Sequence, residues 1–116
     1  MTIVYGIPNC ASVKKARAWL DAHGIVYQFH DFKKQGIDDD RLVRWIEACG
    51  MASVLNRKGT TWRALSDAER ADADTLAGAI ALMRARPSLI KRPVLEQADR
   101  TLLGFDAAHY SEVFGQ

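Results

Sequence analysis

Cys10 is the residue of this chain best suited to nucleophilic chemistry. It lies between a short β-branched run, closed by Gly6 and Pro8, and a segment whose apolar residues recur at helical spacing. The thiolate is the reactive form of cysteine, and the unpaired N–H groups at a helix N-terminus favour it. We therefore predict that Cys10 is catalytic. The alternative is a small buried hydrophobic residue, which is the commoner role of a free cysteine.

Polar and basic neighbours of Cys10 strengthen this prediction. Asn9 is a suitable N-cap for the following helix. We expect the backbone amides of Asn9, Ala11 and Ser12 to donate to the sulfur, with the Ser12 hydroxyl as a further donor. Lys14 and Lys15 would add positive charge within about one helical turn. Asn9 and Ser12 are thus predicted to contribute to the site.

The sequence provides no resolving thiol beside Cys10. Position 13 is Val13, so the second cysteine of a Cys-x-x-Cys dithiol is absent. Cys49 lies on the apolar face of its expected helix, where we predict a packing role. A structural disulfide is not expected, and no metal site is expected because the cysteines and histidines lack zinc-type spacing. Turnover at Cys10 would need a thiol from outside the chain.

Two later segments combine arginine with residues that interrupt regular structure. They are residues 55–62, which include Arg57, and residues 90–94, which include Lys91, Arg92 and Pro93. A guanidinium can hold an oxyanion through two parallel hydrogen bonds. Arg57, Lys91 and Arg92 are therefore candidate ligands of an anion, although most arginines are solvated surface charges. Pro93 opens a strand, where a cis Arg92–Pro93 bond can occur.

Length, charge and hydropathy restrict the class of protein. A chain of 116 residues with a net charge of +2 has the size of one domain and too little charge for a general nucleic-acid surface. One local basic cluster is a candidate for binding a small anion: Arg84, Arg86, Lys91 and Arg92. No apolar run approaches the roughly 18 residues of a membrane-spanning helix. We expect a cytoplasmic protein that binds neither membrane nor nucleic acid directly.

The periodicity of apolar residues predicts an α/β protein. Thr2–Tyr5 is typical of a buried strand, a helix follows as far as Gly24, and residues 25–30 alternate as a second, parallel strand. Residues 33–86 show only helical patterns, including a capped helix at Ser66–Ala71. Two short strands at 94–95 and 101–103 precede a last helix after Gly104. We predict one domain, 1–116, with a β/α core at 1–32 and 87–116 and a helical insertion at 33–86.

Three motifs in this order resemble those of a known family. They are Gly6-Ile7-Pro8-Asn9-Cys10 followed by Val13-Lys14-Lys15-Ala16-Arg17, then Leu55-Asn56-Arg57 with Gly59-Thr60-Thr61-Trp62, then Ile90-Lys91-Arg92-Pro93. The chain is similar over its whole length to the ArsC/Spx/MgsR family, most closely to the YffB-like branch. The resemblance implies a thioredoxin-like (glutaredoxin-like) mixed sheet with flanking helices and an all-helical insertion after the second strand. It also implies a cis-proline facing the cysteine, at Pro93.

The resemblance implies a thiol oxidoreductase chemistry. In arsenate reductases of this family the thiolate attacks arsenic, and glutathione then resolves the adduct. Glutaredoxin finally releases the glutathione from the cysteine. Arg57 and Arg92 match two oxyanion-binding arginines of the family. A third has no clear counterpart in residues 101–105, and Arg100 is offset by several positions. We therefore expect a monomeric, glutathione-dependent reductase without a bound cofactor, in which Arg57, Arg92 or Lys91 holds a carboxylate of glutathione.

The Spx branch of the same family implies a different function. Its members are transcriptional regulators that bind the C-terminal domain of the RNA polymerase α-subunit and are switched by a Cys-x-x-Cys pair. Val13 occupies the second position of that pair here, so this redox switch cannot form. Transcriptional regulation through the RNA polymerase α-subunit is the alternative function.

Overall fold

The computed structural model describes residues 1–116 as two compact units. The sheet unit comprises residues 1–34 and 92–116, and the helical unit comprises residues 35–91. The helical unit follows the second strand, where the sequence predicts a helical insertion. Whether the two units act as one domain stays a prediction.

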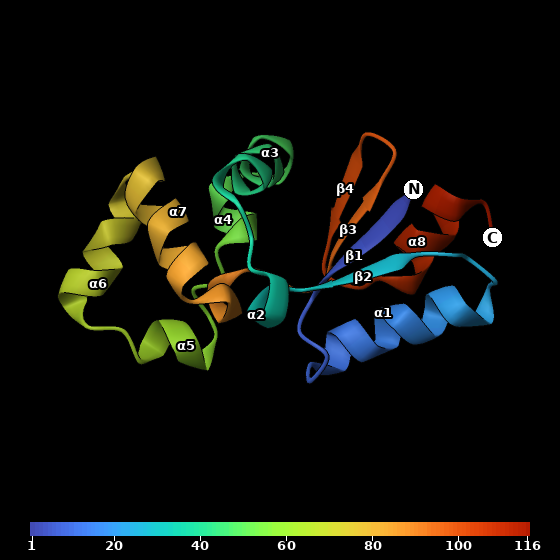
Figure 1. Ribbon diagram of the computed structural model, residues 1–116, viewed down its shortest axis with the longest axis horizontal. Coiled ribbons are helices and arrows are strands. Elements are labelled where there is room, and N and C mark those ends of the chain that lie inside the picture. The colour runs from blue at the N-terminus through green and yellow to red at the C-terminus, as the bar shows by residue number, and fades with distance from the viewer. The chain divides into compact units, whose positions relative to one another are not determined.

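A four-stranded sheet forms the centre of the sheet unit (Figure 1). Its strands are β1 (Thr2–Gly6), β2 (Gln28–Asp31), β3 (Val94–Gln97) and β4 (Arg100–Leu103), in the order β2-β1-β3-β4. β1 is parallel to β2 and antiparallel to β3, and β3 and β4 form a hairpin. The predicted strands are confirmed, with one correction. β2 begins at Gln28 rather than at residue 25, because its pairing with β1 starts at Ile3 opposite Gln28.

Two helices pack on one face of this sheet, α1 (Ala11–Ala22) and α8 (Ala107–Phe114) (Figure 1). The core between them contains Val4, Leu95 and Leu102 from the strands, Ala16 and Leu20 from α1, and Tyr110 from α8. The aromatic ring of Trp19 packs edge-on against Tyr110, with the ring centroids 5.5 Å apart. This βαβ and ββα arrangement is the thioredoxin-like mixed sheet with flanking helices that the family resemblance implies.

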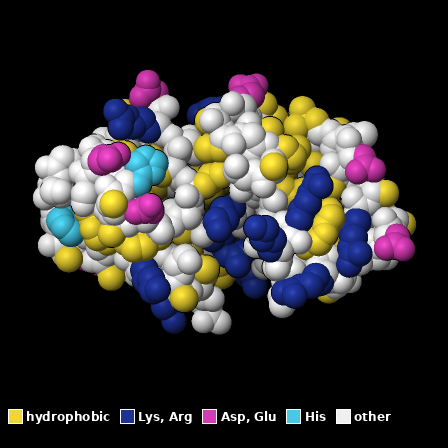
Figure 2. Space-filling model, turned by 180° about the vertical axis from the view of Figure 1, so that it is seen from behind, with side chains coloured by type: hydrophobic (Ala, Val, Ile, Leu, Met, Phe, Trp, Pro, Cys, Tyr) yellow, Lys and Arg dark blue, Asp and Glu magenta, His cyan; other side chains and the backbone are white.

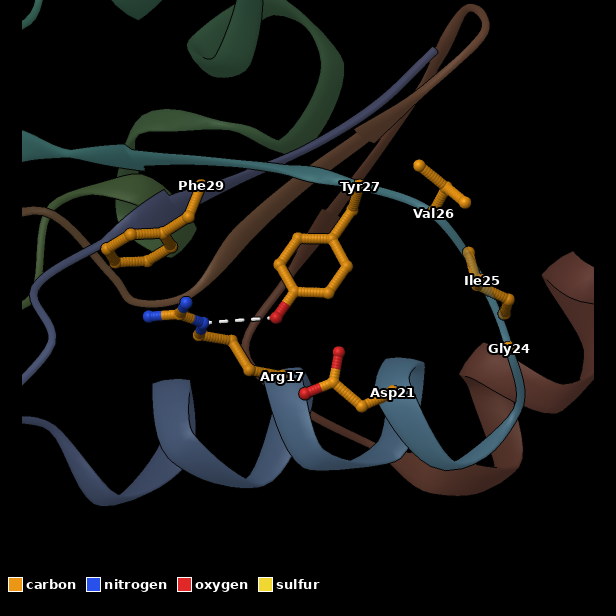
Figure 3. A pocket seen from close by; sticks show the side chains of 7 residues that line it. All are labelled: Arg17, Asp21, Gly24, Ile25, Val26, Tyr27 and Phe29. Carbon is orange, nitrogen blue, oxygen red and sulfur yellow. Dashed lines mark hydrogen bonds between the residues drawn. The ribbon is translucent and has the colours of Figure 1, made fainter.

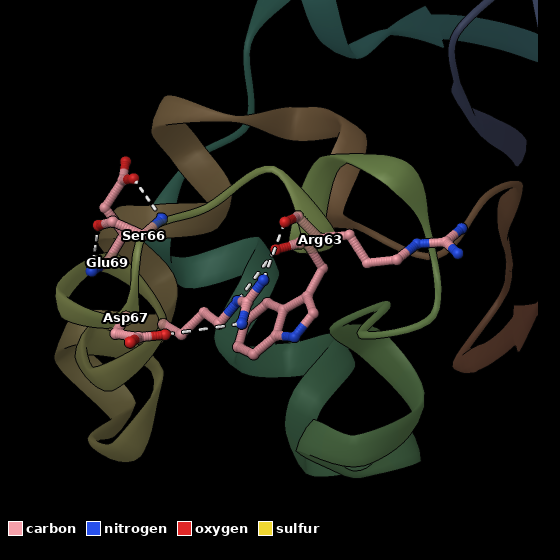
Figure 4. A network of polar contacts seen from close by, with 6 residues as sticks. Arg63, Ser66, Asp67 and Glu69 are labelled. Carbon is pink, nitrogen blue, oxygen red and sulfur yellow. Dashed lines mark hydrogen bonds and ion pairs between the residues drawn. The ribbon is translucent and has the colours of Figure 1, made fainter.

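Between β2 and β3 all the regular elements are helices, and one isolated β-bridge joins Leu55 and Ile90. The helices are α2 (Phe32–Gln35), α3 (Asp39–Cys49), α4 (Met51–Val54), α5 (Thr60–Arg63), α6 (Asp67–Ala71), η1 (Asp72–Asp74), α7 (Leu76–Ala85) and η2 (Pro87–Leu89). α6 is capped at Ser66, as expected. Ser66 and Glu69 form a capping box there, in which each side chain accepts a hydrogen bond from the other's backbone amide (Figure 4). The Arg70 guanidinium bonds the carbonyls of Trp62 and Arg63, which joins α5 to α6. The prediction of an all-helical insertion is therefore confirmed.

The end of β1 and the start of α1 approach each other closely at Gly6. A Cβ atom added to Gly6 would lie 2.7 Å from a methyl carbon of Val13, which is fully buried. Real side chains do not tolerate such a contact without displacing a neighbour. Gly6 thus permits α1 to begin directly beside the end of the central strand, which fixes where the intervening loop and Cys10 lie.

Two tyrosines in the sheet unit provide a test of the packing. The hydroxyl of Tyr110 is buried without a hydrogen-bond partner, whereas that of Tyr5 donates to a carboxylate oxygen of Glu96 at 2.9 Å. An unsatisfied buried hydroxyl is costly, and a satisfied one contributes on the order of 1 kcal/mol. We expect Tyr110→Phe to leave the free energy of unfolding unchanged or raise it, and Tyr5→Phe to lower it by about 1 kcal/mol. Urea denaturation of the two variants would contradict this packing if Tyr110→Phe were the less stable.

Candidate functional site

Cys10 occupies the N-cap position of α1. Its backbone is extended, with φ −141° and ψ 127°, and its carbonyl accepts a hydrogen bond from the Lys14 amide at 2.9 Å. The prediction that Asn9 is the N-cap is wrong. Asn9 is an exposed residue of the loop before the helix, because the short connection from Gly6 brings Cys10, not Asn9, to the first helical turn.

The environment of Cys10 lowers the pKa of its thiol. Partial burial raises the pKa, but this effect is outweighed by the Val13 amide, by the hydrogen bond and charge of Arg92, and by the Ser12 amide. Ser12 and Val13 are the second and third residues of α1. The backbone N–H groups at these two positions normally donate hydrogen bonds to the side chain of the N-cap residue. These two amides favour the negatively charged form of the Cys10 sulfur.

The predicted set of amide donors is thus correct in part. The Ser12 amide lowers the pKa as expected, whereas Asn9 and Ala11 are not among the groups that shift it, and the Val13 amide was not predicted. The signal that could have found Val13 is its spacing, because the third residue after an N-cap regularly donates to that cap. Lys14 and Lys15 are exposed on α1 and are not among the groups that shift the pKa of Cys10.

The sheet topology brings Arg92 and Pro93 to the same end of the sheet as the Cys10 loop. β1 and β3 are antiparallel with Tyr5 opposite Val94, so the end of β1 lies beside the start of β3. The Cys10 loop leaves β1 at this end, and Arg92 and Pro93 enter β3 at the same end. The Arg92–Pro93 bond is cis, and the Pro93 carbonyl accepts a hydrogen bond from Gly104 at 2.9 Å. The guanidinium of Arg92 hydrogen-bonds to Cys10.

Arg57 and Lys91 belong to the helical unit. A β-bridge between Leu55 and Ile90 joins their two segments, with the Lys91 amide 2.8 Å from the carbonyl oxygen of Val54. Arg57 is exposed, and its guanidinium carbon lies 5.3 Å from the ring centroid of Trp62. Lys and Arg side chains are frequent on one face of this unit (Figure 2). That Arg57 and Lys91 act together with Cys10 stays a prediction.

Two members of the predicted basic cluster form ion pairs at the surface. Arg84 contacts the carboxylate of Asp39 at 2.9 Å, and Arg86 contacts that of Glu69 at 2.7 Å. An arginine committed to a carboxylate has less capacity to attract a second anion. These ion pairs reduce the charge that Arg84 and Arg86 offer to a further anion, and an anion site formed by the four basic residues stays a prediction.

Cys49 differs from Cys10 in its environment. It is a half-buried cysteine outside any disulfide, at the end of α3, and burial raises the pKa of its thiol. It is not part of the fully buried core, so the packing role predicted for it applies only in part.

The structure contains no helix with the length and apolar character that a membrane span needs. It also contains no group of three or more His, Cys, Asp or Glu side chains placed to hold a metal ion.

Comparison with known proteins finds relatives along the whole chain. Residues 5–113 match the model of the ArsC family. The solved structure of a YffB protein is 51% identical, with 97% of each chain covered and a TM-score of 0.91. An arsenate reductase (ArsC) related protein from Brucella melitensis is 45% identical, covers 99% of this chain and 95% of that one, and gives a TM-score of 0.74. The global transcriptional regulator Spx of Streptococcus mutans is 28% identical over 109 residues, which are 91% of this chain and 77% of that protein.

These matches extend from β1 into α8 and include both the cysteine motif and the Arg-Pro motif. They confirm the resemblance drawn from the three motifs, including the likeness to the YffB-like branch. The chain belongs to the ArsC family.

Proposed function

We propose that this protein is a glutathione-dependent thiol oxidoreductase with Cys10 as its nucleophile. The observation that carries the proposal is the pair of charge-stabilising groups at Cys10, the α1 amides and Arg92, which lower the pKa of the thiol. A thiolate present at neutral pH can attack an oxidised substrate without a separate base. The membership of the ArsC family, which includes arsenate-reductase-related proteins, supports the same chemistry.

The second thiol in this proposal comes from outside the chain. The Cys10 thiolate attacks the oxidised atom of the substrate and displaces a leaving group. A glutathione thiolate then attacks the Cys10 sulfur of this adduct, and the reduced substrate leaves with the electron pair of the bond to Cys10. The two thiols have then supplied two electrons and are joined as a mixed disulfide of Cys10 and glutathione on the protein. A further thiol, such as that of a glutaredoxin, takes the glutathione by disulfide exchange and restores the Cys10 thiolate. Val13 removes the alternative of a resolving cysteine in the same turn.

The remaining predicted residues have binding roles in this proposal. Arg92 holds an anionic group beside Cys10, Asn9 and Ser12 line the same loop, and Pro93 forms the opposite wall. Arg57 and Lys91 contribute positive charge for a carboxylate of glutathione or for an oxyanion. The proposed enzyme works as a monomer without a bound cofactor, in a reducing compartment such as the cytoplasm, where a free thiolate persists.

A regulatory function is the second candidate, because Spx proteins are relatives at 28% identity. In this alternative the chain binds the C-terminal domain of the RNA polymerase α-subunit and has no redox switch, since Val13 replaces the second cysteine. Co-purification of the tagged protein with the α-subunit would support this alternative over the enzymatic one.

Binding measurements distinguish the proposed substrates. We expect isothermal titration of the reduced protein to detect glutathione, and Arg92→Ala to weaken that binding roughly tenfold because a charge-assisted contact is lost. Arg44→Ala, which removes an exposed charge from α3, is the control and should bind as the wild type does. Arsenate binding that needs both Cys10 and Arg92 would identify an oxyanion substrate instead. If neither glutathione nor arsenate bound, the enzymatic proposal would be contradicted.

The thiolate itself is tested by titration in a Cys49→Ser background. We expect the wild-type Cys10 to titrate below the ordinary cysteine pKa of about 8.5. Arg92→Gln should raise the pKa, because both the hydrogen bond and the positive charge are lost. The thiolate fraction at neutral pH, and with it the rate of alkylation by iodoacetamide, should then fall. Lys14→Gln should change neither quantity, and an equal effect of both variants would show that general surface charge stabilises the thiolate.

The geometry of the Cys10 turn is tested by introducing a second cysteine. Val13 lies in the first turn of α1, and its amide faces the sulfur of Cys10. We expect Val13→Cys, again with Cys49→Ser, to close a disulfide under mild oxidation, measured as loss of both free thiols. Ser12→Cys is the matched control, since residues two apart on a helix do not face each other. Closure by Ser12→Cys but not by Val13→Cys would contradict the observed turn.

A further inference from the structure

A pocket of about 540 Å³ lies within the sheet unit, between α1 and the segment that leads into β2 (Figure 3). Its volume is within the range of roughly 300–1,000 Å³ that small-molecule sites occupy. The residues that line it are Arg17, Asp21, Gly24, Ile25, Val26, Tyr27 and Phe29. None of these residues belongs to the site around Cys10.

Arg17 is held in this pocket by aromatic side chains rather than by a carboxylate. Its Nε donates to the hydroxyl of Tyr27 at 3.1 Å, and its guanidinium carbon lies 4.2 Å from the ring centroid of Phe29. Both contacts fix the plane of the guanidinium. Nε is the nitrogen engaged with the protein, so the two terminal amino groups keep their capacity to donate to a ligand.

Asp21 is the natural ion-pair partner of Arg17, yet the two are not paired. They are four residues apart on α1, the spacing at which opposite charges usually meet. Arg17 turns to Tyr27 and Phe29 instead, and the Asp21 carboxylate has neither an ion pair nor a hydrogen bond. Figure 3 shows this carboxylate pointing toward the space between α1 and Tyr27. The pocket therefore presents one positive and one negative group, both available, on adjacent turns.

The remaining wall of the pocket is apolar. Ile25, Tyr27 and Phe29 are half-buried, and Val26 is 83% exposed, which is unusual for a side chain of its size and polarity. These residues precede or begin β2, an edge strand of the sheet. A ligand that joined the two charges would thus find apolar surface for the rest of its structure, as is typical of small-molecule sites.

We propose that this pocket binds an α-amino-carboxylate, with the ligand carboxylate on Arg17 and its ammonium group on Asp21. In such a ligand a single carbon atom separates the ammonium group from the carboxylate. This spacing matches the opposite charges of Arg17 and Asp21 on successive turns of α1. An apolar side chain of the ligand rests on Tyr27 and Val26. A free amino acid has this chemistry, and so does the γ-glutamyl end of glutathione-like compounds.

The pocket is a site separate from Cys10. Arg17 follows Cys10 by seven residues, which is about 10 Å along a helix. A free amino acid in the pocket would not reach the thiol, and its binding does not depend on the proposed reductase function. Cys10→Ser should therefore leave this binding unchanged, so failure of one proposal would not be mistaken for failure of the other.

The experiment is a titration followed by NMR, using the backbone amides of residues 24–29 as reporters. L-phenylalanine carries both charges, L-phenylalaninamide lacks the carboxylate and N-acetyl-L-phenylalanine lacks the ammonium group. S-methylglutathione has the γ-glutamyl end but no reactive thiol, so it separates the two sources of the ligand chemistry. We expect saturable shifts with at least one of the two zwitterionic probes, and at least roughly tenfold weaker binding of both single-charge analogues.

Variants connect these shifts to the two charges. Asp21→Asn keeps the shape of an exposed side chain and should weaken binding by roughly tenfold or more, as should Arg17→Gln. The matched controls are Glu112→Gln on α8 and Lys15→Gln on the outer face of α1, which change the same charges outside the pocket and should bind normally. Arg17→Gln also loses contacts to Tyr27 and Phe29, so Asp21→Asn is the decisive variant. No saturable shift with either zwitterion, or unchanged binding by Asp21→Asn, would overturn the proposal.

Discussion

The site depends on the stabilisation of one negative charge, that of the Cys10 thiolate, by two groups from opposite ends of the chain. The N-terminal turn of α1 supplies the amides of Ser12 and Val13, and the residue before Pro93 supplies the guanidinium. Partial burial acts against both, because it favours the neutral thiol. The thiolate is favoured only because the three donors together outweigh this cost. The partly buried thiolate of Cys10 is therefore stable only while β1, α1 and the start of β3 keep their relative positions.

The sheet order meets that requirement. β1 is a central strand with β3 antiparallel beside it, so the residues after Gly6 and the residues before Val94 lie at one end of the sheet. Gly6 lets α1 start close to that end, because any larger residue would collide with Val13. Val13 consequently has two roles. Its side chain fills the interior beside β1, and its amide faces the sulfur of Cys10. The position that carries the second cysteine in a dithiol protein thus contributes here to core packing and to stabilisation of the thiolate.

Local patterns predicted most of the elements, since strands, helix starts and caps depend on neighbouring residues. β1, the β3–β4 hairpin, the helix cap at Ser66 and the cis bond at Pro93 are of this kind. The errors have non-local causes. The start of β2 is set by where its pairing with β1 begins, and alternation alone extends that strand back to residue 25. The pairing of Arg84 with Asp39 is likewise non-local, because the two residues are 45 positions apart in sequence. Charge clusters read along the chain do not reveal which charges the fold will pair.

The three flanks of α1 show how a single helix can carry two sites without coupling them. One flank, with Val13, Ala16 and Leu20, is buried against the sheet, and a second presents Trp19 to Tyr110 of α8. These two contacts hold the helix axis in place. The third flank carries Arg17 and Asp21, which are directed to the segment before β2. Because the helix is fixed along two of its sides, a ligand on the third would act on Cys10 only through the electrostatic field. That field is strongly screened over about 10 Å at physiological ionic strength. The chemistry of the thiolate is thus set at the first turn of α1, and the charges farther along the helix are available for recognition.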